Sequence, residues 1–248
     1  MLNPVRGRGA ARVAPALLAI ALALAGAMPA APGIGATRVP RPRAAAMRKA
    51  AVPAAATPAP SPSAATLRVA AWIAATADNH ALPYAIIDKN DAALMLFDAR
   101  GKMIGAVPVL IGVAAGDAAT PGTGSKNLAE IGPAEKTTPA GRFLARYGVA
   151  AGRQRVLWVD YATSVALHPI PPGASPKERR RQRLLSPTPD DNRITFGCIN
   201  VPAAFYARSL APLFRRKGGY VYVLPDSWPI ERVFPGLLAM PVAAGDGG

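Results

Sequence analysis

Residues 84–97 read YAIIDKNDAALMLF, and this stretch decides the fold class. Two apolar runs, Tyr84–Asp88 and Ala93–Phe97, flank a short polar segment that contains Lys89, Asn90 and Asp91. Short apolar runs separated by turn-forming residues are typical of a β-hairpin. The stretch therefore predicts a pair of strands near the start of a mainly β domain.

The pattern continues on both sides of this hairpin. Further strands are predicted in the apolar runs at 103–113, 142–149, 156–161, 164–167 and 220–224. Helices are predicted at 66–76 and at 202–214, where Pro202 stands near the first turn and its missing N–H costs nothing. The polar segments 114–140 and 169–193 are too long to be idle loops in a compact domain. We expect a mainly β fold with two or more helices, and an active site at the loops around residues 168–200.

The first 27 residues have the three parts of a secretory signal peptide. Arg6, Arg8 and Arg12 form a positive start, an apolar run follows at 13–25, and Ala25-Gly26-Ala27 supplies small residues for cleavage. The run is shorter than the roughly 20 apolar residues that a spanning helix needs, which favours cleavage over an uncleaved anchor. We therefore expect export to the periplasm or the cell envelope.

Composition divides the rest of the chain. Residues 28–65 are dominated by Ala and Pro and have few large apolar side chains to bury, so they are predicted to form a disordered linker. A catalytic domain is expected at 66–235, followed by a flexible tail at 236–248. Eight basic and no acidic side chains lie in the first fifty residues. The net charge is +15 for the whole chain and therefore +7 for the remainder. This distribution weakens the case for a nucleic-acid partner, and the moderately basic remainder suits anionic envelope polymers equally well, so that charge alone does not decide. No nucleic-acid partner is predicted.

Cys198 is the only cysteine of the 248-residue chain, which excludes an internal disulfide partner. It lies in Thr195-Phe196-Gly197-Cys198-Ile199-Asn200, between a polar segment and a predicted helix. A glycine before a cysteine lets the backbone approach a substrate closely and leaves N–H groups to bind an oxyanion. Three interpretations stay open from the residues alone: a small buried core residue, an intermolecular bridge, or a reactive nucleophile.

The chain has two histidines. His168 ends a predicted strand, where catalytic side chains are often found, and a histidine near a thiol raises its thiolate fraction. His80 has no catalytic-looking neighbours and is predicted to be a surface residue. Both histidines precede the cysteine, which excludes the order of papain-like proteases, and the spacing of these residues does not fit a zinc site. No metal and no cofactor is therefore predicted.

His168-Pro169, a loop, and then Thr195-x-Gly197-Cys198-Ile199-Asn200 resemble the signature of the L,D-transpeptidase catalytic domain. The segments around it are similar to that family as well. They are the hairpin at 84–97, Thr138-Pro139-Ala140-Gly141-Arg142-Phe143, and the closing strand Val221-Tyr222-Val223-Leu224-Pro225. The resemblance covers roughly residues 82–225 and implies a β-sandwich-like catalytic fold.

The resemblance also implies a chemistry. Cys198 would attack the third residue of a peptidoglycan stem peptide and form a thioester, with His168 as base. The Pro169 carbonyl would orient the histidine, the N–H groups of Gly197 and Cys198 would form an oxyanion hole, and Thr195 and Asn200 would shape substrate binding. The acyl acceptor would be a stem amine in cell wall cross-linking, a lipoprotein lysine, or water. Such domains are typically acylated by carbapenems.

Two departures from the family pattern stand out. Phe196 replaces a histidine that many members have, and the interval between His168 and Cys198 contains a long basic segment at 177–183. That segment is interpreted as a solvated loop or short helix, or alternatively as a lid for anionic groups. A sortase-like enzyme is disfavoured because Gly197 stands where sortases have threonine. A non-catalytic wall-binding protein of the same fold is the remaining alternative.

Overall fold

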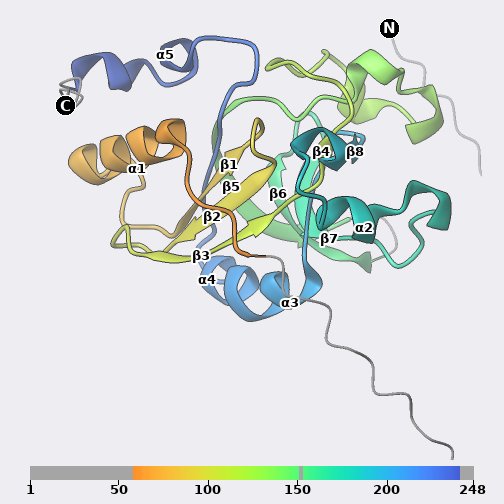
Figure 1. Ribbon diagram of the computed structural model, residues 1–248, viewed down its shortest axis with the longest axis horizontal. Coiled ribbons are helices and arrows are strands. Elements are labelled where there is room, and N and C mark those ends of the chain that lie inside the picture. Colours follow the sequence, from red (N-terminus) through yellow and green to blue (C-terminus); the bar gives the residue numbers. More distant parts are fainter. Residues whose placement is uncertain (1–57, 151–152, 241–248) are drawn as a thin grey trace, which may run out of the picture. The chain divides into compact units, whose positions relative to one another are not determined.

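The computed structural model describes residues 58–150 and 153–240, and within them the chain is mainly β (Figure 1). Eight strands form one mixed sheet in the order β3-β2-β1-β10-β5-β6-β7-β9, and β4 pairs with β8 beside it. The strands are β1 Tyr84–Asp88, β2 Ala93–Phe97, β3 Met103–Pro108, β4 Ile111–Gly112, β5 Gly141–Val149, β6 Arg155–Asp160, β7 Val165–Pro169, β8 Arg193–Thr195, β9 Ile199–Val201 and β10 Gly219–Val223. The predicted mainly β fold with two or more helices is confirmed.

The helices are short apart from the first. They are α1 Ala64–Thr76, α2 Arg180–Leu184, α3 Ala203–Phe205, the π-helical turn Tyr206–Leu210, α4 Ala211–Phe214 and α5 Ile230–Val233. Single 3-10 turns lie at Thr123–Ser125, Leu128–Glu130, Pro133–Glu135, Pro176–Glu178, Pro189–Asn192 and Pro235–Ala239. The predicted helix at 202–214 corresponds to the consecutive segments α3, the π turn and α4.

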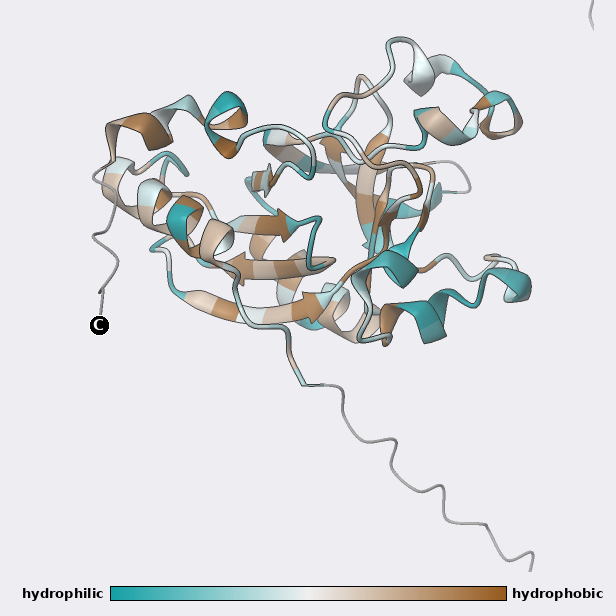
Figure 2. Cartoon of the chain, turned by 45° about the horizontal axis from the view of Figure 1, so that its top comes forward, coloured by the Kyte–Doolittle hydropathy of each residue, from teal (hydrophilic) through white to brown (hydrophobic). Residues whose placement is uncertain are grey.

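The central strands are buried on both faces, which explains why their sequences are continuously apolar. Alternate side chains of β1 point to opposite sides: Ala85 and Ile87 join one core, and Tyr84 and Ile86 join another. The first core is closed by the helix that contains Leu210 and Phe214, and the second by α1 and the segment around Phe234. Figure 1 shows α1 and the α3–α4 helix on opposite sides of the sheet, and Figure 2 shows the hydrophobic strands between them.

Two parallel pairings organise this sheet. β1 pairs in parallel with β10, so that Tyr84 lies opposite Tyr220, and β10 continues into an antiparallel pairing with β5. β7 pairs in parallel with β9 at the other end of the sheet. Parallel neighbours need long connections, and the one between β7 and β9 contains the polar 169–193 segment. This connection carries α2 and sets the position of the residues on either side of it.

The apolar run at 103–113 does not form one strand. β3 ends at Pro108, which has no N–H to donate to a ladder, and β4 pairs with β8 in a separate small sheet. β8 and β9 were not predicted, because strands of three residues are too short to show a periodicity.

A buried ion-pair network ties distant loops together. Lys89 was predicted in a polar turn, yet its side chain is only 1% exposed. Its ammonium donates to Asp117 Oδ1 at 2.7 Å and to the carbonyls of Gly116 and Thr138, and it lies 3.3 Å from Asp226. Asp117 also accepts the backbone N–H groups of residues 226–228. Because every charge has several partners, the network fixes the 114–140 loop against the C-terminal segment.

Both ends of the predicted catalytic domain, residues 66 and 235, lie within the described residues. α1 begins at Ala64, within the predicted linker, because Ser63 caps the N–H of Thr66. Within the predicted tail, Leu237 is fully buried in the core, whereas Leu238 is exposed. The predicted signal peptide at 1–27, most of the linker and residues 241–248 lie outside the described residues. Among the residues described, no helix has both the length and the apolar character that crossing a bilayer demands.

Candidate active site

The parallel pairing of β7 with β9 brings three of the predicted site residues to one face of the sheet. His168 lies opposite Asn200 in the register, and Leu167 lies opposite Ile199. Side chains alternate along a strand, so Leu167 and Ile199 enter the core while His168, Asn200 and Cys198 share the other face. Asn200 is also held by two backbone hydrogen bonds to Leu110, both 2.9 Å long. The register thus fixes the cysteine-bearing turn beside the histidine.

The ring of His168 has a defined orientation. Its Nδ1 lies 2.7 Å from the carbonyl oxygen of Pro169. A carbonyl oxygen only accepts, so Nδ1 carries the proton and Nε2 is the basic nitrogen. Nε2 faces the amide nitrogen of Asn200 at 3.5 Å. The arrangement presents an oriented, neutral imidazole to the face that Cys198 shares.

Cys198 lies in a tight turn between β8 and β9 that its neighbours hold in place. The hydroxyl of Thr195 donates to the Cys198 carbonyl at 2.6 Å and accepts the N–H of Gly197 at 3.2 Å. Thr138, from the loop before β5, donates to the Gly197 carbonyl at 2.8 Å. Thr138 in turn accepts the N–H of Gly112 in β4. Contacts with β8, β4 and the loop before β5 therefore fix the backbone of the turn that carries Cys198.

Only glycine fits at position 197. Its φ is +120°, and a Cβ there would lie 2.7 Å from the carbonyl oxygen of Thr137. The absence of a Cβ lets the turn approach the 137–138 segment closely, and the expected approach to a substrate stays a prediction. The conformational freedom of Gly197 serves the packing of the turn.

Gly197→Ala is therefore expected to lower the free energy of unfolding by more than about 1 kcal/mol, because alanine is strained at positive φ and its Cβ meets backbone. Chemical denaturation measures the change. Gly173→Ala is the matched control, since a Cβ there meets nothing within 4 Å. Equal stability of both variants would show that the turn is not constrained as described.

The contacts of three predicted residues differ from the roles expected for them. The N–H of Gly197 donates to Thr195, so this donor is engaged and the Cys198 N–H is the better candidate for an oxyanion. Thr195 is 1% exposed and Asn200 is 0% exposed. In this structure the Thr195 side chain contacts the turn, and the Asn200 side chain contacts His168 and Arg180. These contacts are of the kind that positions a site.

The thiol of Cys198 is partly exposed and donates to the carbonyl of Ser164 at 3.6 Å. In the part of the chain that the structure describes, no hydrogen bond joins it to His168. Burial raises the pKa of the Cys198 thiol, and a backbone contact and the charge of Arg180 oppose that rise. Burial lowers the pKa of His168, Arg180 lowers it further, and the contact with Pro169 opposes both. Both shifts favour the uncharged forms of the pair, a thiol and a neutral imidazole.

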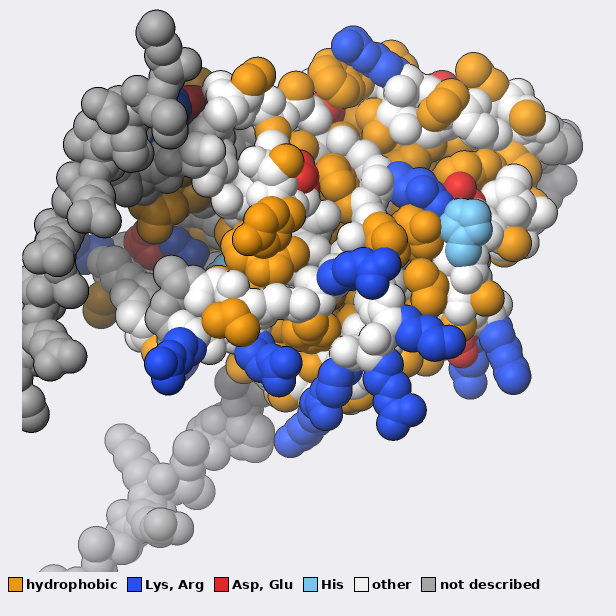
Figure 3. All heavy atoms as spheres, turned by 180° about the vertical axis from the view of Figure 1, so that it is seen from behind, with side chains coloured by type: hydrophobic (Ala, Val, Ile, Leu, Met, Phe, Trp, Pro, Cys, Tyr) orange, Lys and Arg blue, Asp and Glu red, His pale blue; other side chains and the backbone are white. Residues whose placement is uncertain are grey.

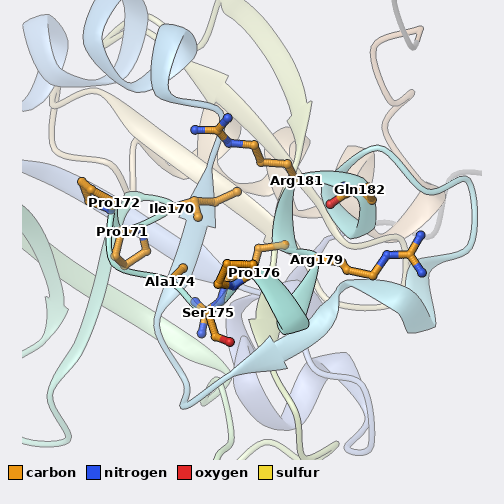
Figure 4. A pocket seen from close by; sticks show the side chains of 10 residues that line it. Ile170, Pro171, Pro172, Ala174, Ser175, Pro176, Arg179, Arg181 and Gln182 are labelled. Atoms are coloured by element: carbon orange, nitrogen blue, oxygen red, sulfur yellow. The ribbon is translucent and has the colours of Figure 1, made fainter.

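The basic segment contributes one residue to the site. Arg180 Nη1 donates to Asn200 Oδ1 at 2.8 Å, and its Nε donates to Glu178 Oε2 at 2.8 Å. A pocket lies beside it, lined by residues 170–172, 174–176 and 179–182. Figure 4 shows Arg179, just before α2, and Arg181, in α2, extending in opposite directions around this pocket. Neither His168 nor Cys198 lines it, so it adjoins the site through Ile170 and Arg180.

Sequence reasoning missed Arg180, Thr138 and the carbonyl of Ser164. Thr138 belongs to the Thr-Pro segment that carried part of the resemblance, so a signal for it existed. Arg180 is one of several consecutive basic residues, and nothing in the sequence distinguishes it from Arg179 or Arg181. His80 lies on the connection between α1 and β1, with its ring 5.7 Å from that of Tyr220. The described residues hold no group of three or more His, Cys, Asp or Glu side chains arranged to bind a metal ion.

Comparison with solved structures finds modest similarities. The L,D-transpeptidase of Xylanimonas cellulosilytica is 15% identical, over 57% of this chain and 60% of that one, with a TM-score of 0.35. The catalytic domain of the E. faecium L,D-transpeptidase is 16% identical, over 57% of this chain and 96% of that one, with a TM-score of 0.32. Two similar structures are thus L,D-transpeptidases.

A third similar structure is the helical cell shape determining protein of Campylobacter jejuni, 14% identical over 63% of this chain and 54% of that one, with a TM-score of 0.40. The matched region thus spans 60% or less of two of these three chains. No protein-family model and no curated protein matches the sequence. All three TM-scores are below 0.5, so these similarities carry no argument about the chemistry of the site.

Proposed function

We propose that the chain is a cysteine-dependent L,D-transpeptidase that acts on peptidoglycan stem peptides in the cell envelope. The observation that carries the proposal is the β7–β9 pairing, which sets an oriented His168 on the face that Cys198 shares. The resemblance of the His168 to Asn200 signature to that family supplies the substrate class. Stem peptides belong to an anionic polymer of the cell envelope, which basic side chains would attract. Figure 3 shows Lys and Arg side chains gathered along the lower edge of one face of the molecule, with few acidic ones.

In the first half of the reaction, Sγ of Cys198 attacks the carbonyl carbon of the third stem residue. The thiol proton passes to Nε2 of His168, whose Nδ1–H stays on the Pro169 carbonyl. The N–H of Cys198 stabilises the oxyanion. The bond to the terminal D-alanine then breaks, and its amine leaves with the proton from Nε2. A thioester on Cys198 remains.

In the second half, an amine of another stem attacks the thioester carbonyl and gives a proton to Nε2 of His168. The carbon–sulfur bond breaks and Sγ takes the proton back, which restores the neutral pair. The resting protonation state suits this cycle, because a neutral imidazole is the form that accepts a proton. General-base transfer during attack also avoids the need for a stable thiolate on a thiol whose pKa is raised.

Incubation of the purified chain with sacculi that carry tetrapeptide stems tests this function. We expect new 3–3 cross-linked dimers and release of D-alanine, measured by liquid chromatography and mass spectrometry of the muropeptides. Tripeptide stems without dimers would identify water as the acceptor and replace transpeptidation with L,D-carboxypeptidase activity. Transfer to an added lysine-containing lipoprotein peptide, without dimers, would identify a protein acceptor. An unchanged muropeptide profile would favour a non-catalytic wall-binding protein.

A further inference from the structure

Arg180 is partly buried and is the basic residue of its segment that contacts Asn200. Its side chain is 12% exposed, whereas Arg179 and Arg181 on either side are exposed. It opens α2, where a positive charge is unfavourable because the first turn of a helix attracts anions. Glu178 compensates with contacts of both carboxylate oxygens to the guanidinium, at 2.8 and 3.3 Å. The site-facing donor, Nη1, is the one that reaches Asn200.

This contact decides which way the amide of Asn200 faces. A guanidinium only donates, so the amide oxygen must point to Arg180 and the NH2 group to Nε2 of His168. The backbone of Asn200 is fixed between β7 and Leu110, which leaves the amide torsion as its main freedom. Arg180, Asn200, His168 and the Pro169 carbonyl thus form one directed chain of hydrogen bonds. In the resting state this chain favours an unprotonated Nε2, because a proton on Nε2 would face the NH2 group of Asn200, which also only donates. The 3.5 Å contact with Asn200 has to open when Nε2 takes the thiol proton.

Three other charged side chains of the described residues lie on neighbouring segments. Glu178 faces Arg180 from the segment before α2. Asp160, the last residue of β6, accepts from the hydroxyl of Thr163 and the N–H of Ala162. Lys136 lies over the ring of Phe196, 4.0 Å from its centre. Arg180 is the charged side chain that influences both the imidazole and the thiol.

We propose that Arg180 is a positioning residue of this site, which orients the Asn200 amide against His168 and holds a positive charge beside the His168–Cys198 pair. The inference rests on the proposed function, in which that pair carries the reaction. It assigns a specific task to the insertion between His168 and Cys198: the segment brings the partly buried Arg180 to the site, while Arg179 and Arg181 stay exposed. Removal of the charge should raise the pKa of both His168 and Cys198, since a nearby cation opposes imidazolium and favours thiolate.

The test compares Arg180→Gln, Arg180→Lys and Arg181→Gln in the full chain. Two readouts need no substrate: the pH profile of Cys198 alkylation by iodoacetamide, and the pH titration of the His168 ring by NMR in a His80→Asn background. In Arg180→Gln both titrations should move to higher pH. Arg180→Lys keeps the charge and should restore both titrations toward the parent. Arg181→Gln removes an exposed guanidinium from the same helix and should change neither.

Acylation should also respond. With a β-lactam acyl donor at neutral pH, Arg180→Gln is expected to acylate roughly 10- to 100-fold more slowly, the loss typical of a hydrogen bond to a charged group. Slower acylation with unmoved titrations in a folded Arg180→Gln protein would overturn the inference, because a merely structural arginine reduces the rate equally at every pH. Shifted titrations in a chain that makes no cross-links would keep the inference and remove the proposed function.

Discussion

Cys198→Ala is expected to lose both turnover and the covalent adduct with a carbapenem. The chain has a single cysteine, so removing its thiol removes the one sulfur nucleophile. Attack of Sγ on the strained lactam carbonyl breaks the carbon–nitrogen bond and leaves the nitrogen protonated, so the adduct adds the whole mass of the drug. Intact-protein mass spectrometry should show this addition in the parent chain and none in the variant.

Cys198→Ser provides the closer steric control. It keeps a hydroxyl in the same turn but offers a much weaker nucleophile, so it should fold like the parent and form little or no adduct. The turn is held by Thr195 and Thr138 rather than by the thiol, which is why both variants should stay folded. An undiminished adduct in Cys198→Ala would place the nucleophile on another residue.

His168→Ala is expected to slow acylation about 10²–10⁴-fold while the fold is kept, the usual contribution of general-base catalysis. The reason is specific to this site: burial raises the pKa of the thiol, so without a base few molecules hold a thiolate at neutral pH. Higher pH should therefore recover part of the lost rate in the variant. Time-resolved mass spectrometry of adduct formation between neutral and alkaline pH measures both effects.

His80→Asn is the matched control for that experiment. His80 has φ +47°, a left-handed conformation that asparagine tolerates better than alanine. It lies on the α1–β1 connection and should acylate at the parent rate. A parent-like rate in His168→Ala would exclude the histidine as the base, and a slow His80→Asn protein would point to a role that neither the sequence nor the geometry indicates.

Local sequence patterns predicted most of the sheet. The hairpin at 84–97 was predicted to the residue, because two apolar runs meet a polar turn and both strands are buried. β8 and β9 were not predicted, since each has three residues and takes its form from β4 and β7. Lys89 belongs to a turn by its neighbours, and only the folded chain brings it to Asp117 and Asp226. Long-range pairing of this kind leaves no periodic trace.

The residues of the candidate site were likewise predicted only in part from the sequence. His168 and Cys198 were singled out by residue type, scarcity and spacing, and the Pro169 carbonyl by resemblance. Thr195 and Asn200 were expected to shape substrate binding, and the structure shows both of them buried. Whether a side chain faces solvent or the turn depends on tertiary packing, which motif spacing does not contain. Arg180 could not be distinguished for the same reason, because the segment around it is uniformly basic.

The parallel pairing of β1 with β10 has a consequence for how the chain folds during synthesis. Tyr84 of β1 cannot pair with β10 before Tyr220 has been synthesised. β1 therefore lacks one of its neighbouring strands until most of the chain has been made. At about 5–20 residues per second, that interval is on the order of ten seconds. Contacts between residues so far apart in sequence also slow folding itself. One edge of β1 therefore stays unpaired in the nascent chain until β10 has been made.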